Sequence, residues 1–372
     1  MVEIIEATTK KEQKRFLDFP LKMYKDCPYF APPLYSDEKK IFNKDYVYYD
    51  TCKAVYYNAY RDGVMVGRIS GILQSVANEK NNRKQIRFTR FDSIDDEEVA
   101  KALFDAVENW GRSLGMEECI GPMGFSDLER EGLLIDGFDK MATFEEQYNF
   151  PYYQKLIEAQ GYTKDVDWFE SEIRHSAKNQ EKLDQIAKSV MERYHLKWSN
   201  AKNTNDFVKK YANGFFDVLD KSYNHIYGTV PFTDGMKEMM LENFKLIINL
   251  KYVDVLLDEN DNVVCMGLCF PAIGEALQKS GGHLTPLGLI RTLHAINHPK
   301  VIDFALIGVD PDWANRGVSA AMIARVNRML ADPSIDHAET NLNLEDNLNI
   351  RNLWKRFESV EHKKRRSFIK KI

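Results

Sequence analysis

The chain has 372 residues, 44% of them hydrophobic and 12% aromatic, and its formal net charge is −5. This length predicts two domains with well-filled cores, and the negative charge argues against nucleic acid as a partner. No apolar run approaches the roughly 18 residues that span a bilayer, and the charged N-terminus is unlike a signal peptide. We therefore expect a cytoplasmic protein with no membrane partner. The five cysteines form no CxxC pair, which favours reduced thiols.

The first half of the sequence predicts a sheet with three helices. Arg61, Asp62 and Gly63 form a hairpin signal between two apolar strands. A long loop with several glycines is expected over residues 126–143. The predicted elements, in chain order, are a strand at 2–8, a helix at 10–25, strands at 54–60, 64–73 and 86–91, a helix at 95–114, a strand at 118–121, a helix at 148–159 and a strand at 166–173.

The second half repeats this order after a polar helix at 176–192. The repeated order is hairpin, strand, helix, strand, helix, strand, which predicts a duplicated domain divided into residues 1–175 and 176–372. The predicted elements are a strand at 194–199, helices at 204–224 and 233–250, strands at 253–257 and 263–270, a broken helical insert at 274–299, a strand at 304–309, a helix at 318–330, a strand at 337–344, a helix at 348–357 and a strand at 362–369.

One stretch of the second half, from Phe304 to Met322, predicts an anion-binding turn. An apolar strand ends at Asp310-Pro311, a polar turn follows through Gly317, and an amphipathic helix begins at Val318. The first turn of a helix carries unpaired N–H groups and a partial positive charge, and glycine lets an anion approach them closely. Many α/β domains have such a turn with nothing bound, so the turn alone leaves both interpretations open.

The same stretch resembles the coenzyme A turn of the GNAT superfamily of acyl-CoA N-acyltransferases. Val309, Pro311, Arg316 and Gly317 match its V-x-P and glycine-containing pattern, whereas Ala314 and Ser319 depart from it. The resemblance implies an α/β (α+β) fold of two tandem GNAT-like domains, each with a mixed, mostly antiparallel sheet flanked by helices. It implies acetyl-CoA as co-substrate, with no metal, bound by Ile307, Val309, Asn315, Arg316, Gly317, Val318, Ser319, Ala320 and Asn347. For Asn347, a simple helix cap is an equal alternative.

The corresponding place in the first half has no glycine. The segment after the strand at 86–91 reads FDSIDDEEVAKALF, with five acids at the helix start. Carboxylates there suit the helix dipole but repel a pyrophosphate. We therefore expect the first domain to be a degenerate copy that binds no coenzyme A.

The expected catalytic residues are less clearly marked. Trp354 stands seven residues after Asn347, where the family often has a tyrosine that protonates the departing thiolate. Glu339, on the strand after the coenzyme A helix, is a candidate base, with an ordinary polar residue of an alternating strand as the alternative. His225 and Tyr227, in a glycine-bearing loop that resembles the acceptor wall of GNAT domains, are candidates for handling protons.

The resemblance predicts an N-acyltransferase, most simply an acetyltransferase, that acts on a small-molecule or peptide amine; a homodimer is one option for its assembly. A GNAT-like protein that binds a ligand or partner without turnover is the alternative. The basic run Lys363–Arg366 is expected to protect an exposed edge strand rather than to bind nucleic acid. The loop acids Asp127, Glu129 and Glu131 either face a cationic acceptor or coat the loop.

Overall fold

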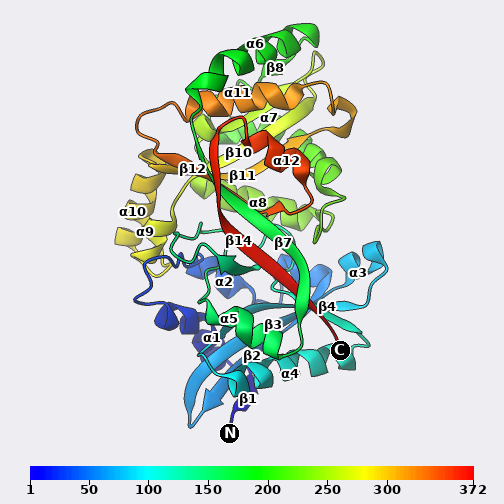
Figure 1. Ribbon diagram of the computed structural model, residues 1–372, viewed down its shortest axis with the longest axis vertical. Helices are drawn as coiled ribbons and strands as arrows, with labels where there is room; N and C mark the ends of the chain where they lie inside the picture. The colour runs from blue at the N-terminus through cyan, green and yellow to red at the C-terminus, as the bar shows by residue number, and fades with distance from the viewer. The chain divides into compact units, whose positions relative to one another are not determined.

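The computed structural model describes residues 1–372, except for the side chains at positions 244 and 246. The chain forms two compact units that do not correspond to a single cut of the sequence (Figure 1). Unit 1 comprises Met1–Phe169, Gly274–Leu289 and Lys363–Ile372, and unit 2 comprises Glu170–Ile273 and Ile290–His362. The predicted boundary after residue 175 lies between a strand that ends at Arg174 and a helix that begins at Ala177.

Most elements of unit 1 lie where the sequence predicts them. The hairpin forms as expected, while one short strand lies inside the segment predicted to be loop, at residues 133–136. The elements are β1 (Glu3–Glu6), α1 (Lys10–Met23), α2 (Tyr35–Lys40), a 3₁₀ turn (Val47–Asp50), β2 (Cys52–Arg61), β3 (Val64–Gln74), α3 (Ser75–Asn81), β4 (Gln85–Ser93), α4 (Glu97–Ser113), β5 (Glu118–Gly121), β6 (Leu133–Asp136), α5 (Tyr152–Ala159), the first part of β7 (Thr163–Arg174), and α9 (Gly274–Gln278).

Unit 2 also follows the prediction, except that the strand expected at 337–344 is divided into β12 and β13. Its elements are α6 (Ala177–Arg193), β8 (Lys197–Trp198), α7 (Thr204–Tyr223), α8 (Asp234–Ile247), β9 (Val253–Leu257), β10 (Val263–Pro271), β11 (Val301–Val309), α11 (Val318–Met329), β12 (His337–Thr340), β13 (Asn343–Leu344) and α12 (Leu348–Trp354). Helix α10 (Pro286–Asn297) and strand β14 (Glu358–Lys371) each have residues in both units.

The strand order is the same in the two units. In unit 1 the order is β1-β2-β3-β4-β5-β14, and in unit 2 it is β8-β9-β10-β11-β12-β7. Each order contains one parallel pair, β4–β5 or β11–β12, among antiparallel neighbours. In each unit, the strand next to the parallel pair comes from the other half of the sequence: β14 lies beside β5, and β7 lies beside β12. This exchange explains why no single cut separates the units.

The basic run at the C-terminus lies inside the sheet of unit 1, so the prediction of an exposed edge strand is wrong. Strand β14 lies between β5 and β7 in the strand order, and the Arg365 side chain is fully buried. Arg366 and Lys364 donate to the buried carboxylate of Asp167 at 2.7 and 2.8 Å. These cations therefore neutralise a buried acid instead of forming a basic surface.

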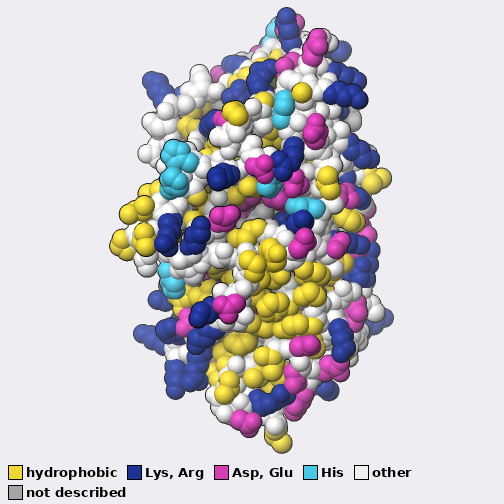
Figure 2. Space-filling view, turned by 60° about the vertical axis from the view of Figure 1, so that its left-hand side comes forward, with side chains coloured by type: hydrophobic (Ala, Val, Ile, Leu, Met, Phe, Trp, Pro, Cys, Tyr) yellow, Lys and Arg dark blue, Asp and Glu magenta, His cyan; other side chains and the backbone are white. Residues whose placement is uncertain are grey.

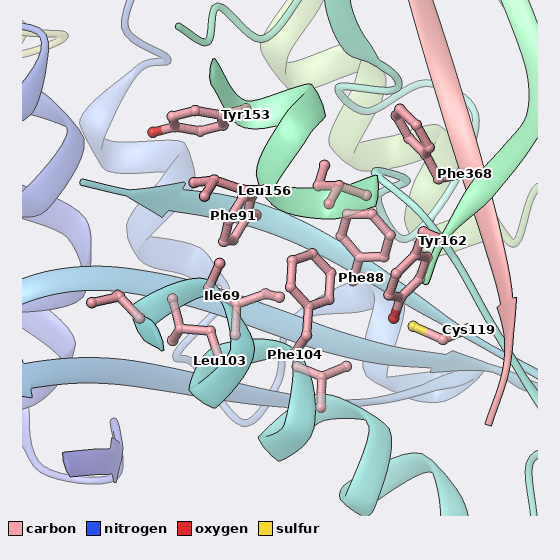
Figure 3. Packing of buried hydrophobic residues seen from close by; sticks show 14 of the residues in the cluster. Ile69, Phe88, Phe91, Leu103, Phe104, Cys119, Tyr153, Leu156, Tyr162 and Phe368 are labelled. Atoms are coloured by element: carbon pink, nitrogen blue, oxygen red, sulfur yellow. The ribbon is translucent and has the colours of Figure 1, made fainter. Parts of the chain in front are cut away.

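The core of unit 1 is rich in aromatic rings. Phe88 and Phe91 of β4 pack against Phe104 of α4, with ring centroids 5.0 and 4.9 Å apart, and Tyr153 of α5 packs on Phe91 (Figure 3). Phe368 of β14 belongs to the same fully buried cluster. The exchanged strand thus contributes to this core directly, as well as through its hydrogen bonds.

The central strands of unit 2 have a helix layer on each face. A side chain at Gly267 in β10 would meet Met322 of α11, and one at Gly308 in β11 would meet Val218 of α7. Helix α6 packs along α11. Glycine at these two positions therefore lets α11 and α7 approach the strands closely.

Candidate functional site

The candidate site lies where β11 and β12 separate. Their parallel pairing runs from Val301 with His337 to Phe304 with Thr340. Strand β12 then ends, whereas β11 continues to Val309 while paired only with β10 in the described sheet. From residue 305 onward, the edge of β11 opposite β10 therefore has no strand beside it in the described sheet.

The turn after β11 has the geometry that the sequence predicts. Asp310 caps a short 3₁₀ turn at Pro311–Trp313 by accepting from the Asp312 N–H at 2.9 Å. Asn315 and Gly317 both have left-handed backbones, with φ of 61° and 78°. Gly317 is the N-cap of α11 and suits this conformation because it has no Cβ. A side chain at this position would also lie 3.2 Å from Val190 of α6.

The start of α11 is suited to an anion. No side chain caps it, and its first turn contains no acid. Its first amides, which begin at Val318 and Ser319, therefore point out of the helix end, where the dipole favours negative charge. This helix end meets the requirement for holding a pyrophosphate.

The equivalent helix of unit 1 starts quite differently. The carboxylate of Asp96 caps α4 by accepting from the Val99 N–H at 3.1 Å. Arg61 pairs with Asp96 at 2.7 Å and with Glu98 at 2.8 Å. The helix start already holds carboxylates and their counter-ion, which fits the prediction of a degenerate copy.

The edge of β4 in unit 1 is also closed by the protein itself. The carbonyl oxygen of Phe88 accepts from the Met123 N–H at 2.9 Å. Farther along the strand, the Ser93 N–H donates to the hydroxyl of Tyr153, and the Ser93 carbonyl accepts from Tyr152. A substrate arm could not pair with these backbone groups without displacing them.

Two polar residues of the expected coenzyme A site lie on different elements, Arg316 in the turn and Asn347 at the start of α12. The Arg316 guanidinium is exposed and lies 4.8 Å from the Trp313 ring centre, so it is held beside the turn. Asn347 caps α12 by accepting from the Ile350 N–H at 3.3 Å. The helix-cap interpretation of Asn347 is therefore correct, and its contact with coenzyme A stays a prediction.

Tyr223, the last residue of α7, contacts the edge of β11 that has no neighbouring strand. Its hydroxyl donates to the Ile307 carbonyl oxygen at 3.2 Å and accepts from the Ile307 N–H at 3.4 Å. A substrate arm at Ile307 would therefore have to displace this hydroxyl. His225, which the sequence favours for proton handling, is exposed in the following turn, and Tyr227 is half-buried. Tyr223 is the residue that reaches the strand, and the roles of His225 and Tyr227 stay predictions.

Trp354, which replaces the expected tyrosine, is part of the core of unit 2. Its ring packs on Phe304, and its indole N–H donates to Asn343 at 2.8 Å. It is 6% exposed. An indole N–H held by an amide oxygen has no proton to give to a thiolate.

Glu339 is the centre of a cluster of acids and histidines beside the point of separation. Its side chain is buried, and its role as a base stays a prediction. One carboxylate oxygen lies 2.7 Å from Nε2 of His362, and the other lies 3.2 Å from Nε2 of His337. Glu172 of β7 is its neighbour in the strand register. His362, on β14, was missed by sequence reasoning because nothing local links it to Glu339.

The two histidines have different surroundings. Burial lowers the pKa of His337, but hydrogen bonds to Glu339 and Asp336 outweigh this effect and raise it. Both ring nitrogens of His337 face carboxylates, which favours the imidazolium. Nε2 of His362 lies at hydrogen-bond distance from Glu339 and donates to it when the ring is neutral. Its Nδ1 would then be the basic nitrogen.

Three members of this cluster have the geometry of metal ligands. Ligand atoms of Glu172, Glu339 and His362 all lie within 4.8 Å of one another. Each carboxylate also has a protein partner, since Arg174 donates to Glu172 at 2.7 Å and His362 to Glu339. These contacts satisfy the carboxylates without a cation. The absence of a metal stays a prediction.

The acids of the unit 1 loop are mostly inside the fold. Glu129 accepts from the Phe125 N–H at 3.1 Å and from the Tyr46 hydroxyl at 3.2 Å. Burial raises the pKa of both Glu129 and Glu131, and Asp127 is half-buried. Glu129 thus holds the loop together rather than coating its surface.

The chain is similar to two curated proteins along most of its length. No protein-family model matches it. It is 26% identical to Protein YghO of Escherichia coli K12 over 375 residues, which cover 98% of this chain and 94% of that protein. It is 25% identical to the bacterial ceramide synthase of Caulobacter vibrioides over 300 residues, which cover 78% and 76% of the two chains.

Solved structures with a similar fold are known. A tandem GNAT protein from the clavulanic acid biosynthesis pathway matches with a TM-score of 0.55 at 10% identity, covering 100% of this chain and 98% of that one. A GCN5-related glucosamine N-acetyltransferase region of a fungal β-N-acetylglucosaminidase matches with a TM-score of 0.58 at 13% identity, covering 100% of this chain and 38% of that one. The chain therefore has the tandem two-domain GNAT fold, as the resemblance in the sequence implied.

Proposed function

We propose that this protein is an N-acyltransferase that moves an acyl group from its coenzyme A thioester to an amine, using unit 2. The observation that carries the proposal is the uncapped, acid-free start of α11 next to the open edge of β11. The helix start would bind the pyrophosphate, and the backbone groups near Ile307 would pair with the extended arm that carries the thioester.

The cluster around Glu339 supports a role in removing the proton from the amine. An amine attacks a carbonyl carbon only when it is neutral, so a base must take its proton directly or through water. Glu339 fixes one ring nitrogen of His362 as a donor, which leaves the other nitrogen to accept a proton. His337, held between two carboxylates, balances the charge of Glu339. We therefore assign the base to His362 and its orientation to Glu339.

The position of Tyr223 supports a role for its hydroxyl in the departure of coenzyme A. When the amine nitrogen bonds to the carbonyl carbon, the carbon–sulfur bond breaks and the sulfur leaves with its electron pair. The Tyr223 hydroxyl lies at the strand edge that would hold this thioester and can donate a proton or hydrogen bond there. The Ile307 N–H, which donates to the Tyr223 hydroxyl at 3.4 Å, would donate to the carbonyl oxygen once that hydroxyl turns towards the sulfur. Tyr223 thus supplies the phenol that Trp354 lacks.

The acceptor is proposed as an amine, and the name of one relative adds a class of substrates to test. A ceramide is an amide between a fatty acid and a long-chain amino alcohol, and the Caulobacter relative is named as a ceramide synthase. Long-chain amines and long-chain acyl-CoA therefore join acetyl-CoA, amino acids and peptide N-termini among the substrates to test.

The test is a turnover assay that measures released coenzyme A thiol and identifies the amide by mass spectrometry. We expect one donor–amine pair to give both products. Changing Tyr223 to Phe should lower kcat on the order of 10-fold, because one hydrogen bond to the reacting thioester is lost, with little change in KM for the donor.

The Tyr227→Phe variant is the matched control for the Tyr223→Phe variant. A larger loss in the Tyr227→Phe variant would show that the sequence prediction for this loop was the better one. Binding of acyl-CoA without any amide product across the donor–amine panel would instead support the alternative of a non-catalytic binding protein.

A further inference from the structure

Helix α10 exposes most of its large apolar side chains. Leu287, Ile290 and Leu293 are 55%, 63% and 42% exposed. The buried positions, Gly288, Thr292 and Ile296, are spaced four residues apart and so lie on one side of the helix. A helix that packs on a protein core shows the opposite arrangement, with its large apolar residues inward.

The exposed apolar residues are concentrated in this one segment. Ten large hydrophobic side chains are exposed among the described residues, and five of them lie between Leu284 and Leu293. The other five are separated along the chain, and single exposed residues of that kind are ordinary on protein surfaces. A continuous apolar strip on one helix marks an interaction surface.

The formal charges around this strip are of one sign. Residues 276–302 contain no Asp or Glu, whereas they contain Lys279, Arg291 and Lys300, of which Lys279 pairs with Glu275 at 3.8 Å. At 100° per residue, Arg291 lies about 40° from Leu287, on one flank of the apolar strip. Figure 2 shows yellow side chains beside dark blue and cyan ones on the side of the molecule where α9 and α10 lie in Figure 1.

We propose that α10 is a membrane-docking helix that lies in the interface of an anionic phospholipid bilayer. Leu287, Ile290 and Leu293 would enter the boundary between headgroups and acyl chains, while the basic flank faces the phosphates. The helix has 12 residues, about 18 Å of length, so it is too short to span the roughly 30 Å hydrocarbon layer. Within the described chain, every helix is too short or too polar to cross a membrane.

A bilayer fits this surface better than a second copy of the chain. The strip is narrow and confined to one helix and the loop before it, and the surrounding residues 276–302 carry three cations, Lys279, Arg291 and Lys300, and no carboxylate. Anionic lipid offers both a hydrocarbon layer and a uniform negative charge. The proposal concerns where the protein works and holds whether or not unit 2 transfers acyl groups.

The experiment measures flotation of the full chain with two kinds of vesicle. One kind contains phosphatidylcholine alone, and the other contains phosphatidylcholine mixed with phosphatidylglycerol. We expect binding to the anionic vesicles to exceed binding to the neutral ones at least about 10-fold at low salt and to fall as salt increases. No binding to anionic vesicles would overturn the proposal.

The combined variant Leu287→Ser, Ile290→Ser and Leu293→Ser tests the helix itself. These side chains are exposed, so the fold should be unchanged, and vesicle binding should fall at least about 10-fold. The control is Leu348→Ser with Val360→Ser, two exposed residues far from α10 in the sequence, which should bind like the parent.

Two further outcomes separate the explanations. Equal vesicle binding by the triple variant and the parent would contradict the assignment to α10. If the parent were a dimer in solution and the triple variant a monomer, with no vesicle binding by either, the strip would be a contact between copies. Turnover of soluble substrates should be the same in the triple variant and the parent, so a failure of docking is distinguishable from a failure of the proposed reaction.

Discussion

Changing Glu339 to Gln is expected to lower turnover at least about 10²-fold, the usual range for the loss of a positioned base. The glutamine amide has nearly the same shape, but it can present an N–H where the carboxylate accepted the proton of His362 Nε2. The imidazole would then turn or change tautomer, and its basic nitrogen would no longer be available to the amine. The affinity for acyl-CoA should change little, since Glu339 does not contact the turn at Gly317.

Two other variants make this test specific. Changing His362 to Gln should cause a similar loss, and combining it with Glu339→Gln should add little, because the two residues act as one unit. Glu358→Gln changes an exposed acid near the start of the same strand as His362 and should behave like the parent. Full turnover in the Glu339 variant, together with a large loss on changing His225 to Gln, would contradict the assignment to Glu339.

Changing Asp167 to Asn is expected to lower the free energy of unfolding by roughly 3–5 kcal/mol. This carboxylate is buried and accepts from Arg366 at 2.7 Å and from Lys364 at 2.8 Å, with Lys164 at 3.2 Å. Asparagine would leave these cations without their counter-charge inside unit 1. Urea denaturation of both proteins at neutral pH measures the difference.

The pH dependence of this effect has a defined sign. Burial raises the pKa of Asp167, but hydrogen bonds from Arg366, Lys364 and Lys164 outweigh it and hold the pKa well below its usual range. The stabilisation is therefore present above the unfolded-state pKa of about 3.9 and is lost as the pH falls through the folded-state value. The difference between parent and variant should thus shrink on acidification.

The exposed pair of Asp139 with Lys140 provides the control for Asp167. Changing Asp139 to Asn should cost less than about 1 kcal/mol, as surface pairs do. If Asp167→Asn lowered the free energy of unfolding no more than Asp139→Asn did, the stability of β14 in the sheet would not depend on the Asp167 carboxylate.

Local sequence signals were sufficient for most of the fold. The turn from Val309 to Val318 follows from residues that act on their immediate neighbours: proline ends the strand, and Gly317 adopts the left-handed conformation. The hairpin at Asp62 and Gly63 forms for the same reason. The repeated order of elements was likewise visible in the sequence, and the tandem GNAT fold is confirmed.

Pairing between distant strands could not be predicted in this way. Strand β14 carries four consecutive basic residues, a pattern typical of an exposed edge, and nothing near it in the sequence shows that Asp167 will face them. The same limit applies to the site: Glu339 was a candidate, but its partner His362 lies 23 residues away on another strand. Periodicity also shows only that α10 is amphipathic and does not show which side is covered.

The central claim, that the start of α11 binds the coenzyme A pyrophosphate, is tested most directly by calorimetric titration with acetyl-CoA. We predict one site per chain, because α4 of unit 1 is already capped by Asp96. Changing Ser319 to Glu, which gives α11 an acidic start, should weaken binding at least about 10-fold, since like charges about 4 Å apart repel by roughly 4 kcal/mol near a protein surface. The helix itself should stay stable, because acids suit its first turn, and Ser319→Gln should bind like the parent. Two sites per chain, or unchanged binding in the Ser319→Glu variant, would contradict the claim.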